Sequence, residues 1–477
     1  MKKNNHLTSM RARCSVLCAA LACAGLLAAC SVAPPYQAPA VEVPASFKEA
    51  GASWNAARPA DAIDRGAWWE IFGDATLDGL AQQVQISNQN IAAAVAAVDQ
   101  ARALVRVQAG GRLPSLGLSV GASREGGGDT ARGTSTSLGL NAAWDADLWG
   151  RLREGVNSAT RSAQASEADL AAARLSAVGT LVQNYFRLRE ADAELGVLAA
   201  TVEAYQRSLQ ITQNRYDSGI AAKTDVLQAQ TQLASTRASL EAMRQTRRTY
   251  EHALAMLTGQ PPAGFALAAT PWAVTVPEVP AVLPSTLLER RPDIAGAERA
   301  VAAANAQIGV ARAAYYPSLS LSGSLGQSGS NLGDLLSASG LLWSLGASVA
   351  QTLFNGGATT AQVDAARAAH AQKTAVYRQT VLAAFQAVED ALGQVQALGA
   401  QQPQLQQALE AADKVEQQML NRYKEGIVQY TDVVTAQVTA LNARRSLLQL
   451  QMNQQIAAAN LVQQIGGGWH MPWLEQK

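Results

Sequence analysis

The cysteines are the residues whose positions point most directly to a chemical modification. All four lie at or before Cys30, in a chain of 477 residues. Cys30 ends the run Leu27-Ala28-Ala29-Cys30, which resembles a bacterial lipobox, where the cysteine is acylated once the preceding segment has been cut off. An ordinary signal peptide that happens to end near a cysteine is the alternative. The small residues directly before Cys30 favour lipidation.

The segment before Cys30 has the composition of a secretion signal. Four basic residues precede an apolar run over residues 14–27, which is too short for a permanent membrane helix. We therefore expect residues 1–29 to be removed, which leaves a mature chain without a disulfide framework. Several acyl chains on Cys30 would anchor that chain stably. The residue after Cys30 is Ser31 and not an Asp, which by resemblance to other lipoproteins favours transfer to the outer membrane.

The other residues that could catalyse a reaction or bind a cofactor form no recognisable motif. The four histidines are scattered, and the sequence has no cysteine cluster, phosphate-binding loop or nucleophile elbow. The net charge of +1 gives no overall field that would attract nucleic acid. The sequence therefore predicts a protein that is not an enzyme, with no metal site, no cofactor beyond the covalent lipid on Cys30, and no nucleic-acid partner.

The chain contains an internal repeat of one unit in two copies. The stretch from Asn214 to Ile220 recurs from Asn421 to Ile427 at an offset of 207, since 421 − 214 = 207. So long a period indicates a duplicated domain-sized unit rather than a solenoid. The expected organisation is a signal peptide at 1–29, a lipidated N-terminal or equatorial segment at 30–85, a first repeat unit at 86–284, a second at 285–466 and a tail at 467–477.

Each unit has two short segments in which apolar residues alternate with small polar residues. This period of two predicts β-strands with one apolar face at 115–123, 134–144, 317–327 and 341–351. A length of roughly ten residues suits a tilted transmembrane strand, and a face of Ser and Gly suits a water-filled lumen. A soluble sheet with one solvated face is the alternative. Two such hairpins behind a lipobox favour the membrane.

Each unit also has two long helical stretches joined by a glycine turn. The sequence predicts helical hairpins at 150–259 and 358–466, with Gly219 and Gly426 ending the first helix of each pair. Pro403 is the repeat equivalent of Gly196 in the first unit, since 403 − 207 = 196. Two residues that disfavour a helix at equivalent positions indicate a shared bend or a break into stacked helices.

The residues around the two turns have a structural interpretation of their own. Thr224 and Thr431 are candidate N-caps, and Asp225 and Asp432 are favourable in the first helical turn. Arg215 and Arg422 would lie in the last turn of the preceding helices, where a cation meets the helix dipole favourably. Three tryptophans could lie at a membrane interface or simply pack: Trp144, Trp149 and Trp343.

The whole mature chain resembles the outer membrane factor family, which is TolC-like, and within it the NodT-type efflux lipoproteins. The resemblance depends on the order and spacing of several stretches rather than on one motif. These are Pro34–Tyr36, Trp68–Asp74, Asp147–Arg151, Arg291–Ile294, Ala314–Pro317, Leu353–Gly357 and the paired Arg-Tyr tips.

The resemblance implies a mainly α-helical fold with a membrane β-barrel. Three copies would each give four strands to one shared 12-strand barrel and long hairpins to a periplasmic α-barrel. Physical reasoning reaches part of this unaided, because four strands cannot close a barrel and open edges are not tolerated in lipid.

The implied function is a passive exit duct of a tripartite efflux system in the outer membrane, extending into the periplasm. Its partners would be two further copies, outer-membrane lipids, a periplasmic adaptor (membrane fusion protein) and an inner-membrane pump of the resistance-nodulation-division (RND) type. The alternatives are a duct for type I protein secretion and a periplasmic coiled-coil lipoprotein without a pore. The cargo and the identity of the pump do not follow from the sequence.

The resemblance also implies that the hairpin tips close the channel through hydrogen bonds and ion pairs between neighbouring hairpins. A trimer would bring three Asp432 carboxylates near one axis, where like charges attract cations. The chain departs from the family pattern at Thr435, where several relatives have an acid. Whether a Tyr–Asp contact forms between hairpins stays open. The matching positions are Tyr216, Thr224, Asp225, Tyr423, Thr431 and Asp432.

Overall fold

A computed structural model describes residues 32–50, 67–125, 133–272, 274–277, 290–330 and 341–467. The chain divides into two compact units. The first, called the sheet unit, contains residues up to 40, 97–167 and 296–379, and the second, called the tip unit, contains 41–96, 168–295 and 380 onwards. Cys30 and the predicted signal peptide lie outside the described residues. Within the described ranges, no helix combines the length and the hydropathy that crossing a membrane requires.

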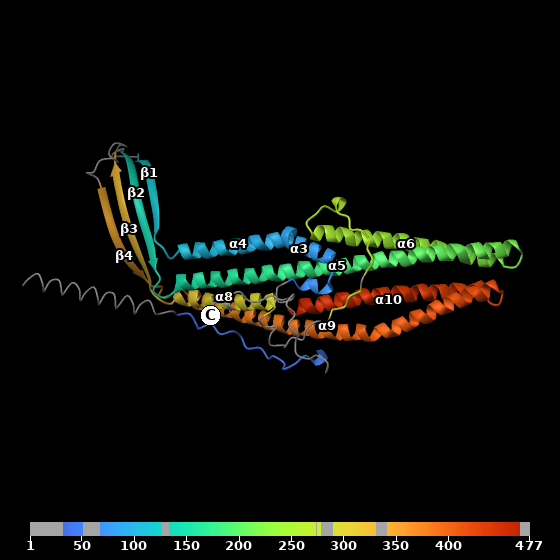
Figure 1. Cartoon of the computed structure of the whole chain (residues 1–477). Coiled ribbons are helices and arrows are strands. Elements are labelled where there is room, and N and C mark those ends of the chain that lie inside the picture. The colour runs from blue at the N-terminus through green and yellow to red at the C-terminus, as the bar shows by residue number, and fades with distance from the viewer. Residues whose placement is uncertain are drawn as a thin grey trace, which may run out of the picture. The chain divides into compact units, whose positions relative to one another are not determined.

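The sheet unit contains one antiparallel sheet of four strands in chain order (Figure 1). The strands begin and end at or close to the residues predicted from the alternating pattern. The pairing of β2 with β3 joins the two repeats, and the outer edges of β1 and β4 have no partner strand within the described chain. The strands are β1 (Ser115–Glu125), β2 (Gly133–Ala146), β3 (Ser318–Gly329) and β4 (Leu341–Ala350).

The strand register places the large apolar residues of all four strands on one face, except Leu342 of β4, which pairs with Gly326 on the other face. Leu118 pairs with Leu140, Leu140 with Leu325, and Leu325 with Trp343, so a row of large side chains crosses the sheet. The other face is polar and small, and Ser324 and Ser344 contact there through their hydroxyls at 2.8 Å. The single apolar face is therefore confirmed. Its residues stay uncovered in the isolated chain, as for the 81% exposed Leu345.

The helices of the sheet unit hold the segment that follows the proposed lipidation site. α4 (Gln89–Gly110) and α8 (Pro292–Ala313) each have most of their length in this unit, and α8 begins at Pro292, a residue type that suits the first turn of a helix. The Asn305 side chain of α8 donates to the Pro34 carbonyl at 3.0 Å, and the Tyr36 hydroxyl donates to Glu298. The chain just after Cys30 is thus bound to α8.

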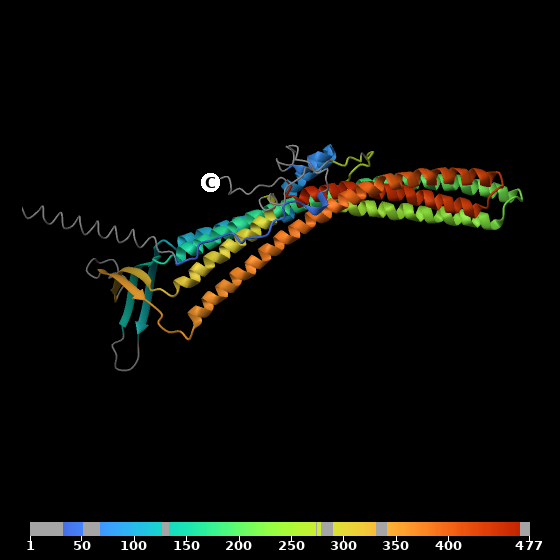
Figure 2. The same cartoon turned by 90° about the horizontal axis from the view of Figure 1, so that it is seen from below.

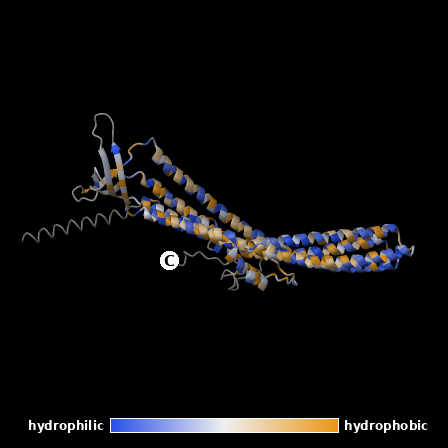
Figure 3. Cartoon of the chain, turned by 90° about the horizontal axis from the view of Figure 1, so that it is seen from above, coloured by the Kyte–Doolittle hydropathy of each residue, from blue (hydrophilic) through white to orange (hydrophobic). Residues whose placement is uncertain are grey.

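Four long helices form the two predicted hairpins. α5 (Arg151–Asp217) is followed by α6 (Lys223–Leu257), and α9 (Ala358–Lys424) is followed by α10 (Tyr430–Gln464) (Figure 2). Hydrophilic and hydrophobic residues mix along all four (Figure 3), which suits helices with more than one environment around their surface. In the tip unit α6 packs against α10.

Of the two alternatives predicted at Gly196 and Pro403, the break is wrong, because α5 and α9 continue through these positions, and the shared bend stays a prediction. Proline removes one backbone donor and displaces the carbonyl four residues earlier, which here belongs to Gly399. The residues from 399 to 404 are exposed, so water can bond to the displaced carbonyl and the helix need not end.

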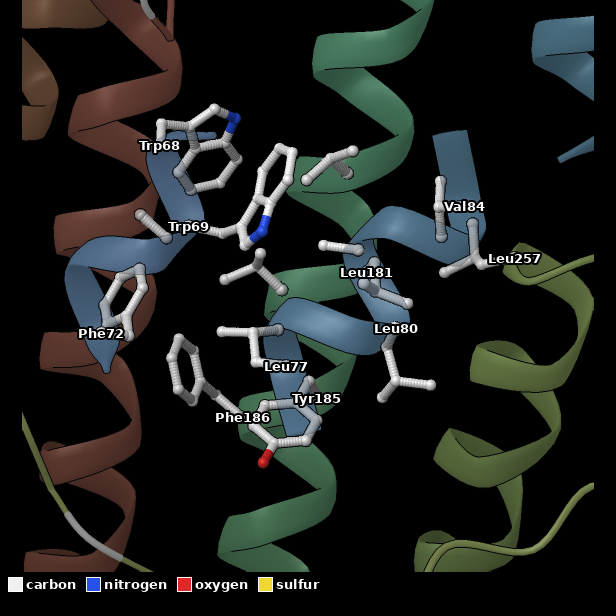
Figure 4. Close-up of a cluster of buried hydrophobic side chains, with 14 of the residues drawn as sticks. Trp68, Trp69, Phe72, Leu77, Leu80, Val84, Leu181, Tyr185, Phe186 and Leu257 are labelled. Atoms are coloured by element: carbon white, nitrogen blue, oxygen red, sulfur yellow. The ribbon is translucent and has the colours of Figure 1, made fainter. Parts of the chain in front are cut away.

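The core of the tip unit is built around an aromatic segment that precedes the first repeat. η2 (Trp68–Phe72) and α3 (Ala75–Ser87) lie against α5 (Figure 4). Trp68, Trp69 and Phe72 are each under 5% exposed, and burying each such side chain contributes roughly 1.5–3 kcal/mol. Phe72 and Phe186 meet edge to face with ring centroids 4.9 Å apart.

Asp74 fixes the direction of α3 within this core. Its carboxylate accepts from the backbone nitrogens of Thr76 at 2.9 Å and Leu77 at 3.2 Å, which caps the helix, and also from the Tyr185 hydroxyl of α5. The predicted N-terminal segment at 30–85 therefore contains a short helix that the sequence analysis did not anticipate, and this helix packs into the core.

Candidate functional site at the hairpin tips

Both hairpins turn through the same hydrogen-bonded motif. In the first, the Ile220 N–H donates to the Arg215 carbonyl at 2.8 Å and the Gly219 N–H to the Tyr216 carbonyl at 2.9 Å. This is the bond pattern of a Schellman motif, which needs a left-handed residue, and Gly219 has φ of 74°. The second tip repeats it with Gly426 at φ 80°. Both glycines thus end their helices as predicted.

The predicted N-caps Thr224 and Thr431 are wrong by two residues. α6 begins at Lys223 with Ala222 as its N-cap, and no side chain caps it. α10 begins at Tyr430, and its N-cap is Gln429. Each threonine therefore lies inside the first turn, where its backbone is already helical and its hydroxyl cannot act as an N-cap.

The two aspartates take different roles although their positions are equivalent. Asp432 completes a capping box, in which its carboxylate accepts from the Gln429 N–H at 3.2 Å and the Gln429 side chain bonds to the Asp432 backbone. The Asp225 carboxylate forms no such bond with the N–H of its own N-cap residue, Ala222, and contacts another element instead. Both acids lie in the first helical turn, as predicted.

Asp225 contacts the second hairpin. The Tyr423 hydroxyl donates to Asp225 Oδ2 at 3.5 Å, a long and therefore weak bond. Tyr423 is 3% exposed, and its ring meets that of Tyr430 edge to face at 5.1 Å. Burial raises the pKa of both phenols, so both hydroxyls keep their protons as donors. The inter-hairpin Tyr–Asp contact left open by the sequence thus forms within one chain.

Arg215 makes the shortest polar contact between the two tips. Its guanidinium donates to the Lys424 carbonyl at 2.7 Å and lies 4.9 Å from the centroid of the Tyr423 ring. Lys424 is the last residue of α9, so its carbonyl has no partner inside that helix. Arg215 therefore donates to the free carbonyl at the end of α9 in the other hairpin, and its charge also interacts favourably with the dipole of its own helix, α5.

The structure does not bring all the predicted gate residues together. Tyr216 is 37% exposed and faces Lys223 of its own hairpin, whose Nζ lies 5.2 Å from the ring centroid. Thr224 is exposed, whereas Thr431 Oγ1 donates across to Gln228 at 3.3 Å. The ring of three Asp432 carboxylates belongs to the assembled trimer and stays a prediction.

Sequence reasoning missed several residues of this site, among them Tyr430 and Ser208. Tyr430 is 1% exposed and its hydroxyl lies 3.2 Å from that of Ser208 on α5. Tyr430 is the first residue of α10, and its equivalent in the first unit is Lys223, since 430 − 207 = 223. This difference between the repeats was a signal that the tips are not equivalent.

The tryptophans of the sheet unit divide between packing and exposure. Trp149 Nε1 donates to the Pro317 carbonyl at 2.7 Å and its ring stacks on Tyr316 at 4.7 Å, so packing accounts for it. Trp144 Nε1 donates to the Arg112 carbonyl at 2.9 Å. Trp343 is 72% exposed on the apolar face of the sheet, where a membrane-interface role stays a prediction.

The contacts between the tips are individually of modest strength. Their polar contacts are single hydrogen bonds and ring contacts, each worth only about 0.5–3 kcal/mol. Among the residues that the structure describes, no cluster of His, Cys, Asp and Glu is arranged to hold a metal ion.

Within the described chain, the sheet has unpaired edges and an uncovered apolar face, and the long hairpins contact each other at their tips. These features are those of a subunit of a shared membrane channel. The chain belongs to the outer membrane efflux protein family, whose model matches residues 80–260 and 283–467. The function predicted from the sequence, an outer-membrane efflux channel, is thereby confirmed.

Individual relatives match over nearly the whole chain. The cation efflux system protein CusC of Escherichia coli O6:H1 is 32% identical over 462 residues, which cover 95% of this chain and 98% of CusC. The pyoverdine export outer membrane protein OpmQ of Pseudomonas aeruginosa is 31% identical and covers 93% of this chain and 95% of its own.

Solved channel structures show the same fold. The structure of the outer-membrane channel OprN superposes with a TM-score of 0.84 at 30% identity, and it covers 93% of this chain and 100% of OprN. The predicted fold class is confirmed: long helical hairpins form an α-barrel, and four strands per chain contribute to the β-barrel of a trimer.

Proposed function

We propose that this chain is the passive exit duct of a tripartite efflux system, which receives small toxic compounds from an RND-type inner-membrane pump through a periplasmic adaptor. Likeness over nearly full length to a cation efflux protein and a pyoverdine exporter carries the proposal. The tip geometry supports it, because contacts of modest strength can hold a pore closed and still be reversed by a partner that binds only the open state.

The cargo is set by the pump rather than by the duct. CusC is named for cations and OpmQ for pyoverdine, so two relatives that match this chain over nearly its whole length belong to systems with chemically different cargo. The polar face of the sheet supports this view. It consists mainly of Ser, Gly and Asn, so it carries few groups that could select one solute over another.

Deletion of the gene and complementation tests the proposal. The deletion strain should become more susceptible to several unrelated toxic compounds, and the intact gene should restore its resistance. An unchanged profile over antibiotics, metals, dyes and solvents, together with loss of a secreted protein, would indicate a secretion duct instead.

Anchoring through Cys30 is the second part of the proposal. The binding of Pro34 and Tyr36 to α8 ties the residues that follow Cys30 to the sheet unit, which agrees with an anchor close to the barrel. Cys30→Ala should abolish both acylation and cleavage before residue 30. Mass spectrometry of the mature N-terminus checks this, and an unmodified N-terminus at another residue in the unaltered protein would contradict it.

A further inference from the structure

The tip of the first hairpin forms a socket that the second hairpin fills. This first socket consists of Ser208, Thr212, Asp225, Gln228 and Ala229. Three residues of the second hairpin occupy it. Tyr430 contacts Ser208, Tyr423 bonds to Asp225, and Thr431 bonds to Gln228. Thr212 lies beside both phenol hydroxyls, and Ala229 packs in one apolar cluster with both rings.

The internal repeat places an equivalent socket on the second hairpin. Adding 207 to each residue of the first socket gives the second socket: Val415, Met419, Asp432, Thr435 and Ala436. All five line one open groove between α9 and α10, with a volume of about 570 Å³. The described residues of the same chain leave this groove open, whereas the first socket is filled.

We propose that in the trimer the second socket holds Tyr216, Lys223 and Thr224 of the neighbouring copy, with the Lys223 ammonium paired to Asp432. These three residues are the repeat equivalents of Tyr423, Tyr430 and Thr431, since 423 − 207 = 216, 430 − 207 = 223 and 431 − 207 = 224. The inference rests on the trimeric channel of the proposed function and adds the contact that joins its subunits at the tip.

Ring closure supplies the geometric reason. In a closed ring of three copies, the first hairpin of each chain has its own second hairpin on one side, so the second hairpin of the next copy must lie on the other. Tyr216 and Lys223 are exposed in the single chain and already lie together, with Nζ 5.2 Å from the ring centroid. The equivalent pair, Tyr423 and Tyr430, is 5.1 Å apart inside the first socket.

The substitutions between the two sockets match the substitution between their occupants. Ser208 and Thr212, which face phenol hydroxyls, are replaced by Val415 and Met419 where Lys223 replaces Tyr430. The aliphatic stem of a lysine packs well on such apolar side chains while its ammonium reaches outward. Asp432 is the one acid among the five residues of the second socket. Within a chain the acid of the socket thus meets a phenol hydroxyl, whereas between copies it meets an ammonium.

Cysteine cross-linking tests the contact directly. Thr224 and Thr435 are the equivalents of Thr431 and Gln228, whose side chains contact at 3.3 Å. In isolated outer membranes, a short bis-maleimide should join Thr224→Cys/Thr435→Cys chains into covalent dimers and trimers. The matched control, Gln228→Cys/Thr431→Cys, should react within single chains. The proposal is overturned if the control pair reacts within single chains while the Thr224→Cys/Thr435→Cys pair yields no linked copies.

Charge reversal tests the ion pair in the same assay. Lys223→Glu should lower the yield of linked copies several-fold. The double variant Lys223→Glu/Asp432→Lys should restore the yield, whereas the single variant Asp432→Lys should not reach the yield of the unaltered charge pair. The exposed Lys373→Glu serves as the charge control. Salt near 1 M, where the screening length is about 3 Å, should lower the yield between copies and leave the reaction within a chain unchanged.

The charge-reversal outcomes separate this inference from the proposed function. A double variant that fails to recover cross-linking, or a yield that does not respond to salt, would show that Lys223 and Asp432 do not pair. Resistance of the complemented strain is measured independently of these yields. Failed cross-linking with restored resistance therefore rejects only the tip contact, and the converse rejects only the efflux role.

Discussion

Arg215 shows that a side chain can satisfy the end of a helix other than its own. Its position in the last turn of α5 was predictable, because cations favour helix C-termini. Its bond to the Lys424 carbonyl was not, since this contact depends on the placement of two hairpins about 200 residues apart in the chain. The same holds for Tyr423 and Asp225, which only the folded tips bring together.

Replacing Arg215 should loosen the closed tips. Arg215→Ala removes a charge-assisted bond worth roughly 1.5–3 kcal/mol and leaves the Lys424 carbonyl without this partner. We expect open-channel events in planar bilayers to become about tenfold more frequent. Tyr423→Phe should have a smaller effect, because its 3.5 Å bond is weak. Arg207→Ala, at an exposed pair on the same helix, is the control. Equal behaviour of Arg215→Ala and Arg207→Ala would contradict a closing role.

A pair of buried carboxylates in the tip unit makes a pH dependence predictable. Glu190 and Glu194 lie one turn apart on α5, and the Arg445 guanidinium of α10 donates to Glu194 at 2.6 Å. Burial, together with the neighbouring Glu194, raises the pKa of Glu190 to about 7. Arg445 opposes this shift, but it bonds to Glu194 rather than to Glu190.

The folded protein should therefore lose stability as the pH rises. A carboxyl whose pKa rises from 4.5 to about 7 binds its proton more tightly in the folded state. The resulting penalty is absent below about pH 4.5 and complete above about pH 7, and it amounts to at most roughly 3 kcal/mol per chain. Glu190→Gln should remove this decline in the melting temperature of the detergent-solubilised protein. The exposed Glu203→Gln should keep it, and a parallel decline in both variants would refute the assignment.

At the scale of elements, two glycines at the ends of the hairpins allow the same close backbone contact in both repeats. Gly259 has φ of 73°, and a Cβ there would lie 2.4 Å from the Ser87 carbonyl oxygen. Gly466, its equivalent at the offset of 207, has φ of 99°, and a Cβ would lie 2.2 Å from the Arg290 carbonyl oxygen. In both copies, the end of the second long helix thus touches the backbone just before the helix that opens a repeat.

Alanine at either glycine should destabilise the fold strongly. The left-handed backbone alone costs about 1–2 kcal/mol with a side chain, and the clash is with backbone, which cannot rotate away. Gly259→Ala and Gly466→Ala should each lower the melting temperature of the purified protein. Gly196→Ala, in a helix with open space around it, should raise the stability by about 0.5–1 kcal/mol. A change of the same sign at all three sites would contradict the packing role.

Elements were predictable where a local pattern determines them. The strands follow from alternation, and the helix ends at Gly219 and Gly426 follow from the need for a left-handed residue. α3 was missed because its burial depends on α5, which lies about 100 residues further along the chain. The N-caps were misassigned because threonine favours a cap intrinsically, whereas the turn geometry begins each helix two residues earlier.

At the scale of the whole molecule, the single chain is an incomplete structure. Among the residues that the structure describes, none pairs with the outer edges of β1 and β4 or covers the apolar face of the sheet. Lipid can cover the apolar face, but it cannot supply hydrogen bonds to an open strand edge. Only neighbouring copies can do so, and the same argument applies to the two unequal sockets at the tips. Physical reasoning requires closure by more than one chain, and the family supplies the number three.

The central claim is that three chains build one channel rather than three, and single-channel recording of the purified trimer tests it most directly. Its mass would be fixed beforehand by native mass spectrometry. A shared barrel predicts one conducting pathway, so each trimer should enter a planar bilayer as a single current step and close in a single step. Three equal steps per trimer would show three separate pores, and a trimer that never conducts would show no pore. Either result would contradict the shared channel.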